Sequence, residues 1–135
     1  MRYIKKIFFA LAICFSVLGC SPTDIIGPAI QAYIMWKNGE GHMYFKTDRE
    51  TAFEALKRTL VELNYDIADI STDRNGDYQL IATNRSRFKI KVTQVTNEIT
   101  SVSIRVNFMG DKDYANLIYD RLSKQMNVID FNTIK

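Results

Sequence analysis

Hydrophobic and polar residues follow two regular patterns along the chain from residue 40 onward. In residues 40–47 they alternate, with Met43 and Phe45 on one side, which predicts a β-strand. From residue 48 to about residue 64, apolar side chains return every three or four positions, which is typical of an amphipathic helix. A Thr47-x-x-Glu50 capping box begins this helix, with Asp48 as the alternative N-cap. The apolar stripe consists of Ala52, Phe53, Leu56, Leu60 and Leu63.

Four further strands are predicted, because short alternating runs are separated by turn residues. The runs cover residues 65–71, 77–83, 87–95 and 99–109. Asn75-Gly76 marks the first hairpin and predicts a type I′ turn, in which both central residues have positive φ. Gly110-Asp111 then ends the last strand and caps a second amphipathic helix over residues 112–126. Residues 127–135 are predicted to form either a short strand or a loose end.

The predicted order of elements is β-α-β-β-β-β-α. Tight turns between consecutive strands favour an antiparallel meander. We therefore predict an α+β fold, an antiparallel sheet of about four to five strands with two helices packed on one face. Residues 40–135 form this single domain, which is long enough to bury a core of its own.

The first twenty residues have the layout of a secretory signal. Arg2, Lys5 and Lys6 form a positive region, residues 7–18 are uncharged and strongly apolar, and Gly19-Cys20 closes the stretch. A transmembrane helix needs about 20 consecutive apolar residues, and the polar run that begins at Ser21 comes too early for one. The sequence therefore predicts a signal peptide over residues 1–19.

Val17-Leu18-Gly19-Cys20 resembles the lipobox of bacterial lipoproteins. The resemblance implies cleavage between Gly19 and Cys20, and attachment to the membrane through acyl chains on Cys20. Ser21 stands after the cysteine where Asp would favour inner-membrane retention, which implies the periplasmic side of the outer membrane. The alternative is an ordinary signal peptide with an incidental cysteine. Because Cys14 lies in the predicted signal and Cys20 becomes a thioether, thiol catalysis, a disulfide and a cysteine metal site are excluded.

Residues 20–39 are predicted to be a lipidated tether, because Pro and Gly interrupt them and they lack clean periodicity. They are nevertheless fairly apolar. One interpretation places them near the lipid headgroups, with Tyr33 and Trp36 as interfacial aromatic residues. The other is a short helix or strand that packs on the domain.

The composition is 47% apolar and 24% charged, which excludes a disordered chain and an integral membrane bundle. The net charge of +3 describes the whole chain, including the three cations of the predicted signal. Without them, the remaining 15 Lys and Arg equal the 15 Asp and Glu. A nucleic-acid-binding domain would carry a basic excess, so we predict no nucleic-acid partner.

A basic stripe is the most suggestive feature of the predicted sheet. Arg85, Arg87, Lys89 and Lys91 alternate with apolar residues, and Arg105 on the following strand extends the stripe. These five residues are candidates for binding an anionic lipid or polymer. The alternative is a solvated face whose cations pair with Asp or Glu across strands or protect the sheet from edge aggregation.

We identify no catalytic residue, metal site or cofactor site in the sequence. Asp73-x-Asn75-x-Asp77 resembles the start of a calcium loop, but Tyr78 and Asn84 occupy the positions that require Gly and Glu. His42 is the single histidine, which makes a poor transition-metal site in the absence of thiols. No hydrolase or phosphate-loop motif is present.

The chain also resembles a domain-of-unknown-function family of small Gram-negative lipoproteins. The matching features are Cys20, Tyr33, Gly39-Glu40, the helix at residues 52–63, Ile104-Arg105-Val106 and Gly110-Asp111. The resemblance implies a lipoprotein with an α+β domain and implies no reaction.

Together these patterns predict a lipid-anchored, periplasm-facing outer-membrane lipoprotein. We expect a non-catalytic structural or interaction protein that docks another envelope protein. The alternative is a binding module whose basic strand face holds an anionic lipid or cell-wall polymer.

Overall fold

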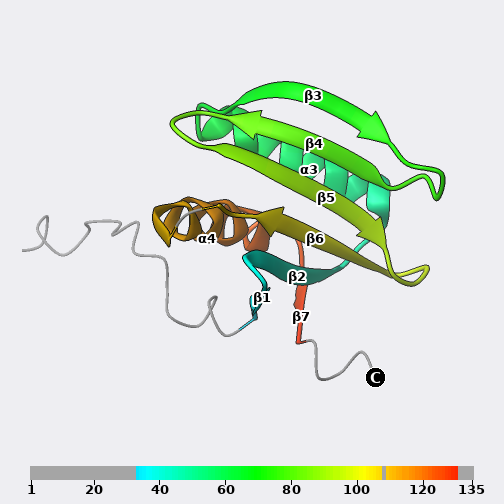
Figure 1. The fold of residues 1–135 in the computed structure, drawn as a ribbon. Helices are drawn as coiled ribbons and strands as arrows, with labels where there is room; N and C mark the ends of the chain where they lie inside the picture. The colour runs from blue at the N-terminus through cyan, green and yellow to red at the C-terminus, as the bar shows by residue number, and fades with distance from the viewer. Residues whose placement is uncertain (1–32, 108, 131–135) are drawn as a thin grey trace, which may run out of the picture.

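The computed structural model describes residues 33–107 and 109–130. They form a twisted antiparallel sheet and two helices (Figure 1). The elements, in chain order, are β1 Met35–Lys37, β2 Glu40–Lys46, α3 Arg49–Glu62, β3 Asp66–Thr72, β4 Tyr78–Thr83, β5 Arg87–Gln94, β6 Ile99–Arg105, α4 Met109–Ser123 and β7 Val128–Ile129.

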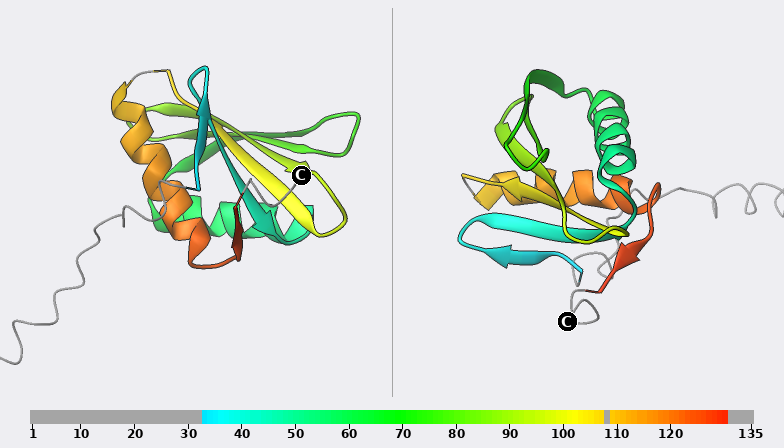
Figure 2. Two further views of the ribbon diagram at one scale, coloured as in Figure 1. Left: turned by 90° about the horizontal axis from the view of Figure 1, so that it is seen from below. Right: turned by 90° about the vertical axis from the view of Figure 1, so that its right-hand side faces the viewer.

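The sheet has seven strands in the order β1-β2-β6-β5-β4-β3, and β7 pairs with β2 on the same edge as β1. Both helices lie on one side of it, α3 behind β3 to β5 and α4 across the end of β6 (Figures 1 and 2). We call the opposite side, which no helix of the described residues covers, the open face.

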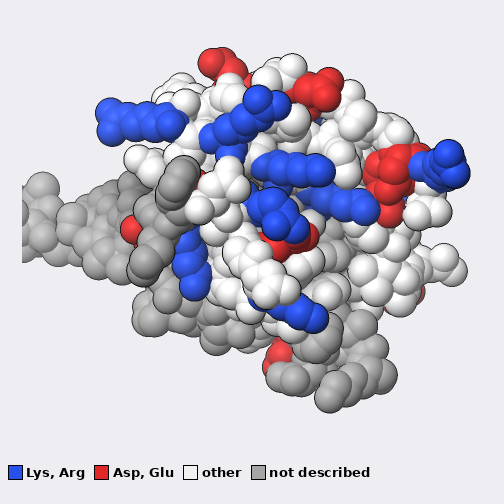
Figure 3. All heavy atoms as spheres, in the orientation of Figure 1, with Lys and Arg blue, Asp and Glu red and all other residues white. Residues whose placement is uncertain are grey.

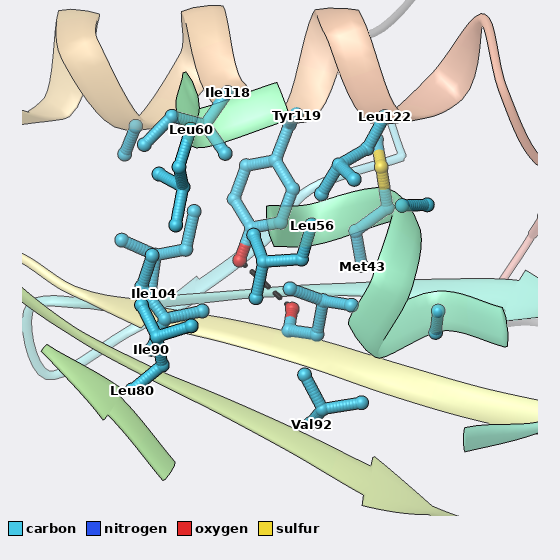
Figure 4. Close-up of a cluster of buried hydrophobic side chains, with 14 of the residues drawn as sticks. Met43, Leu56, Leu60, Leu80, Ile90, Val92, Ile104, Ile118, Tyr119 and Leu122 are labelled. Atoms are coloured by element: carbon cyan, nitrogen blue, oxygen red, sulfur yellow. Dashed lines mark hydrogen bonds between the residues drawn. The ribbon is translucent and has the colours of Figure 1, made fainter. Parts of the chain in front are cut away.

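The core lies between this sheet and the helices. Inward side chains of β2, β4, β5 and β6 meet the apolar stripes of α3 and α4 in one cluster (Figure 4). Tyr119 on α4 is fully buried in it, and its hydroxyl lies 2.6 Å from the carbonyl oxygen of Gly41 and 2.9 Å from that of Val102. The burial raises the pKa of Tyr119 well above 10. This hydroxyl therefore stays a neutral donor that ties α4 to β2 and β6.

The predicted sheet of about four to five strands was wrong. The sheet has seven strands, and the order is β-β-α-β-β-β-β-α-β, although the α+β character remains. Strand β1 lies in the range predicted as tether, and β7 lies in the C-terminal segment left open between strand and loose end.

The missed strand β1 is created by a turn at Asn38-Gly39. Their φ angles are 53° and 76°, and Lys37 pairs directly with Glu40. Two residues with positive φ between paired strands are the hallmark of a type I′ hairpin, for which Asn-Gly is the preferred sequence. Ile34, just before β1, is buried. The interpretation in which this stretch packs on the domain therefore holds for residues 34–37.

The second Asn-Gly pair forms a hairpin of another type. Of the loop residues 73–77, Gly76 has a φ of 82°, and Asn75 is not left-handed, so the predicted type I′ turn was wrong. The Asp73 carboxylate accepts hydrogen bonds from the N–H groups of Asn75 and Asp77, at 2.8 and 3.0 Å. This side chain stabilises a longer loop than a two-residue turn allows.

Two predicted element ends also needed correction. Asp48 is the N-cap of α3, since its carboxylate accepts from the Thr51 N–H at 3.1 Å. Strand β6 ends at Arg105 and α4 begins at Met109, three residues before the predicted start. Asp111 lies inside the first turn, where its carboxylate accepts a 2.5 Å hydrogen bond from the Ser86 hydroxyl. It therefore joins α4 to the β4–β5 turn.

Candidate anion-binding face

Four of the five predicted basic residues lie together on the open face. Arg87, Lys89 and Lys91 point outward from β5, since Phe88, Ile90 and Val92 between them are fully buried. Arg105 on β6 lies directly opposite Lys89 in the strand register. Arg85 is exposed in the β4–β5 turn. Figure 3 shows Lys and Arg gathered over the middle of this face. We call these five residues the basic cluster.

Three residues of the cluster, Lys89, Lys91 and Arg105, line a hollow of about 240 Å³, which we call the β4–β6 hollow. Its lining residues are Glu40, Gln79, Lys89, Lys91, Ser103 and Arg105. The small side chain of Ser103 on β6 lies opposite the long side chain of Lys91 on β5, which leaves space on this side of the sheet. An adjoining hollow of about 270 Å³ shares Lys89 and Arg105 and includes Arg87.

Two cations of the cluster have carboxylate partners. Lys91 Nζ lies 3.6 Å from Asp73 Oδ2, and Arg105 Nη2 lies 2.7 Å from Glu40 Oε2. Within residues 33–107 and 109–130, no ion pair is formed by Arg85, Arg87 or Lys89. The cross-strand pairing alternative therefore accounts for two of the five cations and leaves three unexplained.

The position of β5 also removes the second structural explanation. Charged side chains protect a sheet from aggregation when they lie on an edge strand. Strand β5 lies between β4 and β6, inside the sheet. The cations of β5 therefore have no edge to protect.

Three residues of the β4–β6 hollow were missed by the sequence analysis. Glu40, Gln79 and Ser103 come from three different strands, β2, β4 and β6. The alternation of β6 predicted that Ser103 points outward, but the proximity of the three residues depends on the strand register. Glu40 is placed opposite Arg105 by the β2–β6 pairing and Gln79 opposite Lys91 by the β4–β5 pairing.

The loop that holds Lys91 has its own electrostatics. The N–H groups of Asp77 and Asn75 lower the pKa of the Asp73 carboxyl, and the Lys91 ammonium adds to the effect. Asp77, which is buried, binds the Arg49 guanidinium at 3.1 Å. Both carboxylates of the calcium-like motif are thus engaged by donors of the protein itself.

The remaining predicted site residues add no reactive group. His42 Nε2 lies 3.5 Å from Glu40 Oε1. In the described part of the chain, His, Cys, Asp and Glu nowhere gather in a group of three that would hold a metal ion. Gly19 and Cys20, the predicted cleavage and lipidation site, lie outside the described residues. Within those residues, no helix combines the length and apolar character needed to cross a bilayer.

The surface offers less for docking a protein partner. The exposed large apolar side chains are spread over different elements, among them Val61 on α3, Ile70 on β3 and Val95 after β5. The free edge strand β3 carries Asp66 and Asp69, and its register shifts between Ile67 and Asp69. Charges and a bulge are the devices that keep an edge from pairing with another chain. The open face is therefore the better candidate site.

Comparison with known proteins gives a family and no activity. No curated protein matches the chain. The model of a family described as "Protein of unknown function (DUF3568)" matches residues 4–125, which is most of the chain and includes every strand except β7. The chain therefore belongs to this family of proteins of unknown function.

Proposed function

We propose that this protein is a lipid-anchored, non-catalytic protein of the bacterial envelope that binds an anionic ligand through the open face of its sheet. The main support is that Arg87 and Lys89 have no carboxylate partner among the described residues, although they point outward from a strand inside the sheet. Of the two functions predicted from the sequence, the binding module is the better supported.

The proposed anchor is Cys20, on the periplasmic side of the outer membrane. Its support is the charged, apolar and lipobox-like sequence of residues 2–20 together with Ser21. A single acyl chain binds a membrane only marginally, while two or more hold it stably, at about 0.8 kcal/mol per buried CH₂. Mass spectrometry of the purified protein should find a diacylglyceryl adduct at Cys20 as the new N-terminus, and an unmodified Cys20 would contradict the anchor.

Binding is tested with the whole protein in uncharged detergent micelles. Purified cell wall is sedimented with it across a salt series, and micelles doped with phosphatidylglycerol or phosphatidylcholine provide the lipid arm. The matched variant replaces Arg85, Arg87, Lys89 and Lys91 with Ser.

Binding to either anionic surface should weaken as salt rises, because exposed charges are screened over about 10 Å at 0.1 M salt. The variant should bind at least tenfold more weakly, since several charges are removed together. Equal binding by the variant, or no binding by the native protein, would contradict the proposed function.

A further inference from the structure

We infer that the β4–β6 hollow is a subsite for a phosphate monoester. The inference rests on the proposed function and names the ligand chemistry of the same face. It is carried by the strand register, the donor set of the hollow and the charge that its lining leaves uncompensated.

A row of side chains crosses the open face at the level of Lys89. The register places Lys37, Glu40, Arg105, Lys89, Ile81 and Asp69 side by side, from β1 through β2, β6, β5 and β4 to β3. The charges alternate from Lys37 to Arg105, and then Arg105 and Lys89 stand directly opposite each other. Like charges in this position destabilise a sheet. An anion between them would remove the repulsion.

The hollow presents hydrogen-bond donors to such an anion. Lys89, Lys91 and Arg105 contribute charged N–H groups, and Gln79 and Ser103 contribute an amide and a hydroxyl. Glu40 is the single carboxylate of the lining, and it already accepts from Arg105 at 2.7 Å. A guanidinium has five N–H groups, so this contact fixes Arg105 and leaves donors for a ligand.

The charge around the hollow favours a monoester. Glu40 pairs with Arg105, and Asp73 beside the hollow pairs with Lys91. Among the described residues, two cations here therefore lack a carboxylate partner, Lys89 in the hollow and Arg87 in the adjoining one. A phosphate monoester carries about −1.5 to −2 at pH 7, because its second pKa is near 6. A phosphodiester carries a single negative charge and leaves one cation uncompensated. The volume of about 240 Å³ is far above the roughly 10–15 Å³ that one water requires.

The test uses the whole protein in uncharged detergent with glycerol 3-phosphate as the probe. Affinity is measured by calorimetry, and amide shifts of Ser103 and Lys89 locate the site. Dimethyl phosphate is the diester control. The variants are Lys89→Gln and Arg105→Gln in the hollow and, as the control, Arg58→Gln on α3 on the other side of the sheet. Each of them removes one charge.

Glycerol 3-phosphate should bind at least tenfold more tightly than dimethyl phosphate at pH 7.5, and this advantage should shrink at pH 5. Lys89→Gln and Arg105→Gln should each weaken binding tenfold or more, and Arg58→Gln less than twofold. Equal affinities for monoester and diester, or equal losses in all three variants, would overturn the subsite and leave a diffuse effect of charge. If the native protein bound no anion at all, the proposed function would be overturned as well.

A final arm identifies the source of the phosphate. Short-chain phosphatidic acid is added to the micelles while glycerol 3-phosphate is bound. Displacement assigns the subsite to a lipid headgroup. Continued binding of glycerol 3-phosphate assigns it to a soluble or polymer-borne monoester, and both results support the hollow as a monoester site.

Discussion

Single polar side chains decide how the helices and loops of this protein are held. Tyr119 is the clearest case, because one hydroxyl proton is shared between the carbonyl oxygens of Gly41 and Val102 in the core. Burial of an unpaired polar group is costly. The hydroxyl is thus part of the packing of α4 on the sheet.

Replacement of Tyr119 by Phe should lower the free energy of unfolding by about 1–2 kcal/mol, because two buried carbonyls lose a donor. Urea denaturation followed by the fluorescence of Trp36, the single tryptophan, measures it. Tyr114→Phe is the control, since Tyr114 is 36% exposed, and it should cost no more than about 0.5 kcal/mol. Equal costs for the two variants would contradict the role of the hydroxyl.

Asp73 links stability to pH. Its pKa lies below the ordinary value of 3.8 in the folded protein, chiefly because the N–H groups of Asp77 and Asn75 donate to it. The folded state thus binds this proton less readily than the unfolded state. Its contribution to stability is present above the unfolded pKa and is lost as pH falls through the folded pKa.

Asp73→Asn should therefore flatten the decline in stability below pH 4, since the amide does not titrate. Denaturation curves at pH 3 to 7 measure the change. The pKa of Asp48 is also lowered, by hydrogen bonds from Thr51. Part of the decline in stability at low pH should therefore remain in both the native protein and the variant. An acid limb of unchanged slope would rule out this role for Asp73.

At the scale of elements, the β1–β2 hairpin completes one edge of the sheet. Strand β1 has three residues and depends on the positive φ of Asn38 and Gly39. A Cβ at Gly39 would lie 3.1 Å from the Val106 carbonyl oxygen. Trp36 packs over Gly41 on the neighbouring strand, where a Cβ would lie 3.0 Å from the indole ring. Both glycines are therefore set by close approach of another group.

Gly39→Ala should destabilise the protein by about 1–2 kcal/mol, because a left-handed conformation with a Cβ is strained. Hydrogen exchange should show the loss first in the amides of β1 and the first half of β2. Asn38→Gly retains a residue that tolerates positive φ, and it should change stability by less than about 0.5 kcal/mol. Faster exchange confined to another edge of the sheet would argue against this assignment.

At the scale of the whole molecule, the charges that would bind an anion on the open face also lower the stability of the sheet. The open face keeps Lys89 opposite Arg105 although an acid there would stabilise the sheet. Natural proteins retain such locally unfavourable choices at functional sites. The proposed ligand would supply the missing negative charge.

Lys89→Glu should raise the free energy of unfolding by about 0.2–1 kcal/mol, because it converts a repulsive cross-strand pair into an attractive one. The same change should abolish binding of glycerol 3-phosphate. Thermal denaturation without ligand and calorimetry with it measure the two effects. A variant that is less stable than the native protein would show that Lys89 has a structural role instead.

The sequence predicted those elements whose apolar residues recur with a clear helical or strand period. The stripe of Ala52, Leu56 and Leu60 predicted α3, and the alternation of Phe88, Ile90 and Val92 predicted both β5 and the outward direction of its cations. These features are set by the periods of helix and strand, which the sequence displays directly. The capping residues Thr47 and Asp48 were both identified, and the structure selected Asp48.

Tertiary structure decided what depends on pairing between distant segments. Asn38-Gly39 carried a hairpin signal, but a strand of three residues has too few positions to show alternation, and β7 has two. The β4–β6 hollow joins Glu40, Gln79, Lys89 and Ser103 from four strands, so it exists once the register is fixed. The sequence by itself therefore determined which residues are basic and outward. The sheet decided which of them stand opposite a carboxylate and which stand opposite one another, because the register brings together residues that are far apart in the chain.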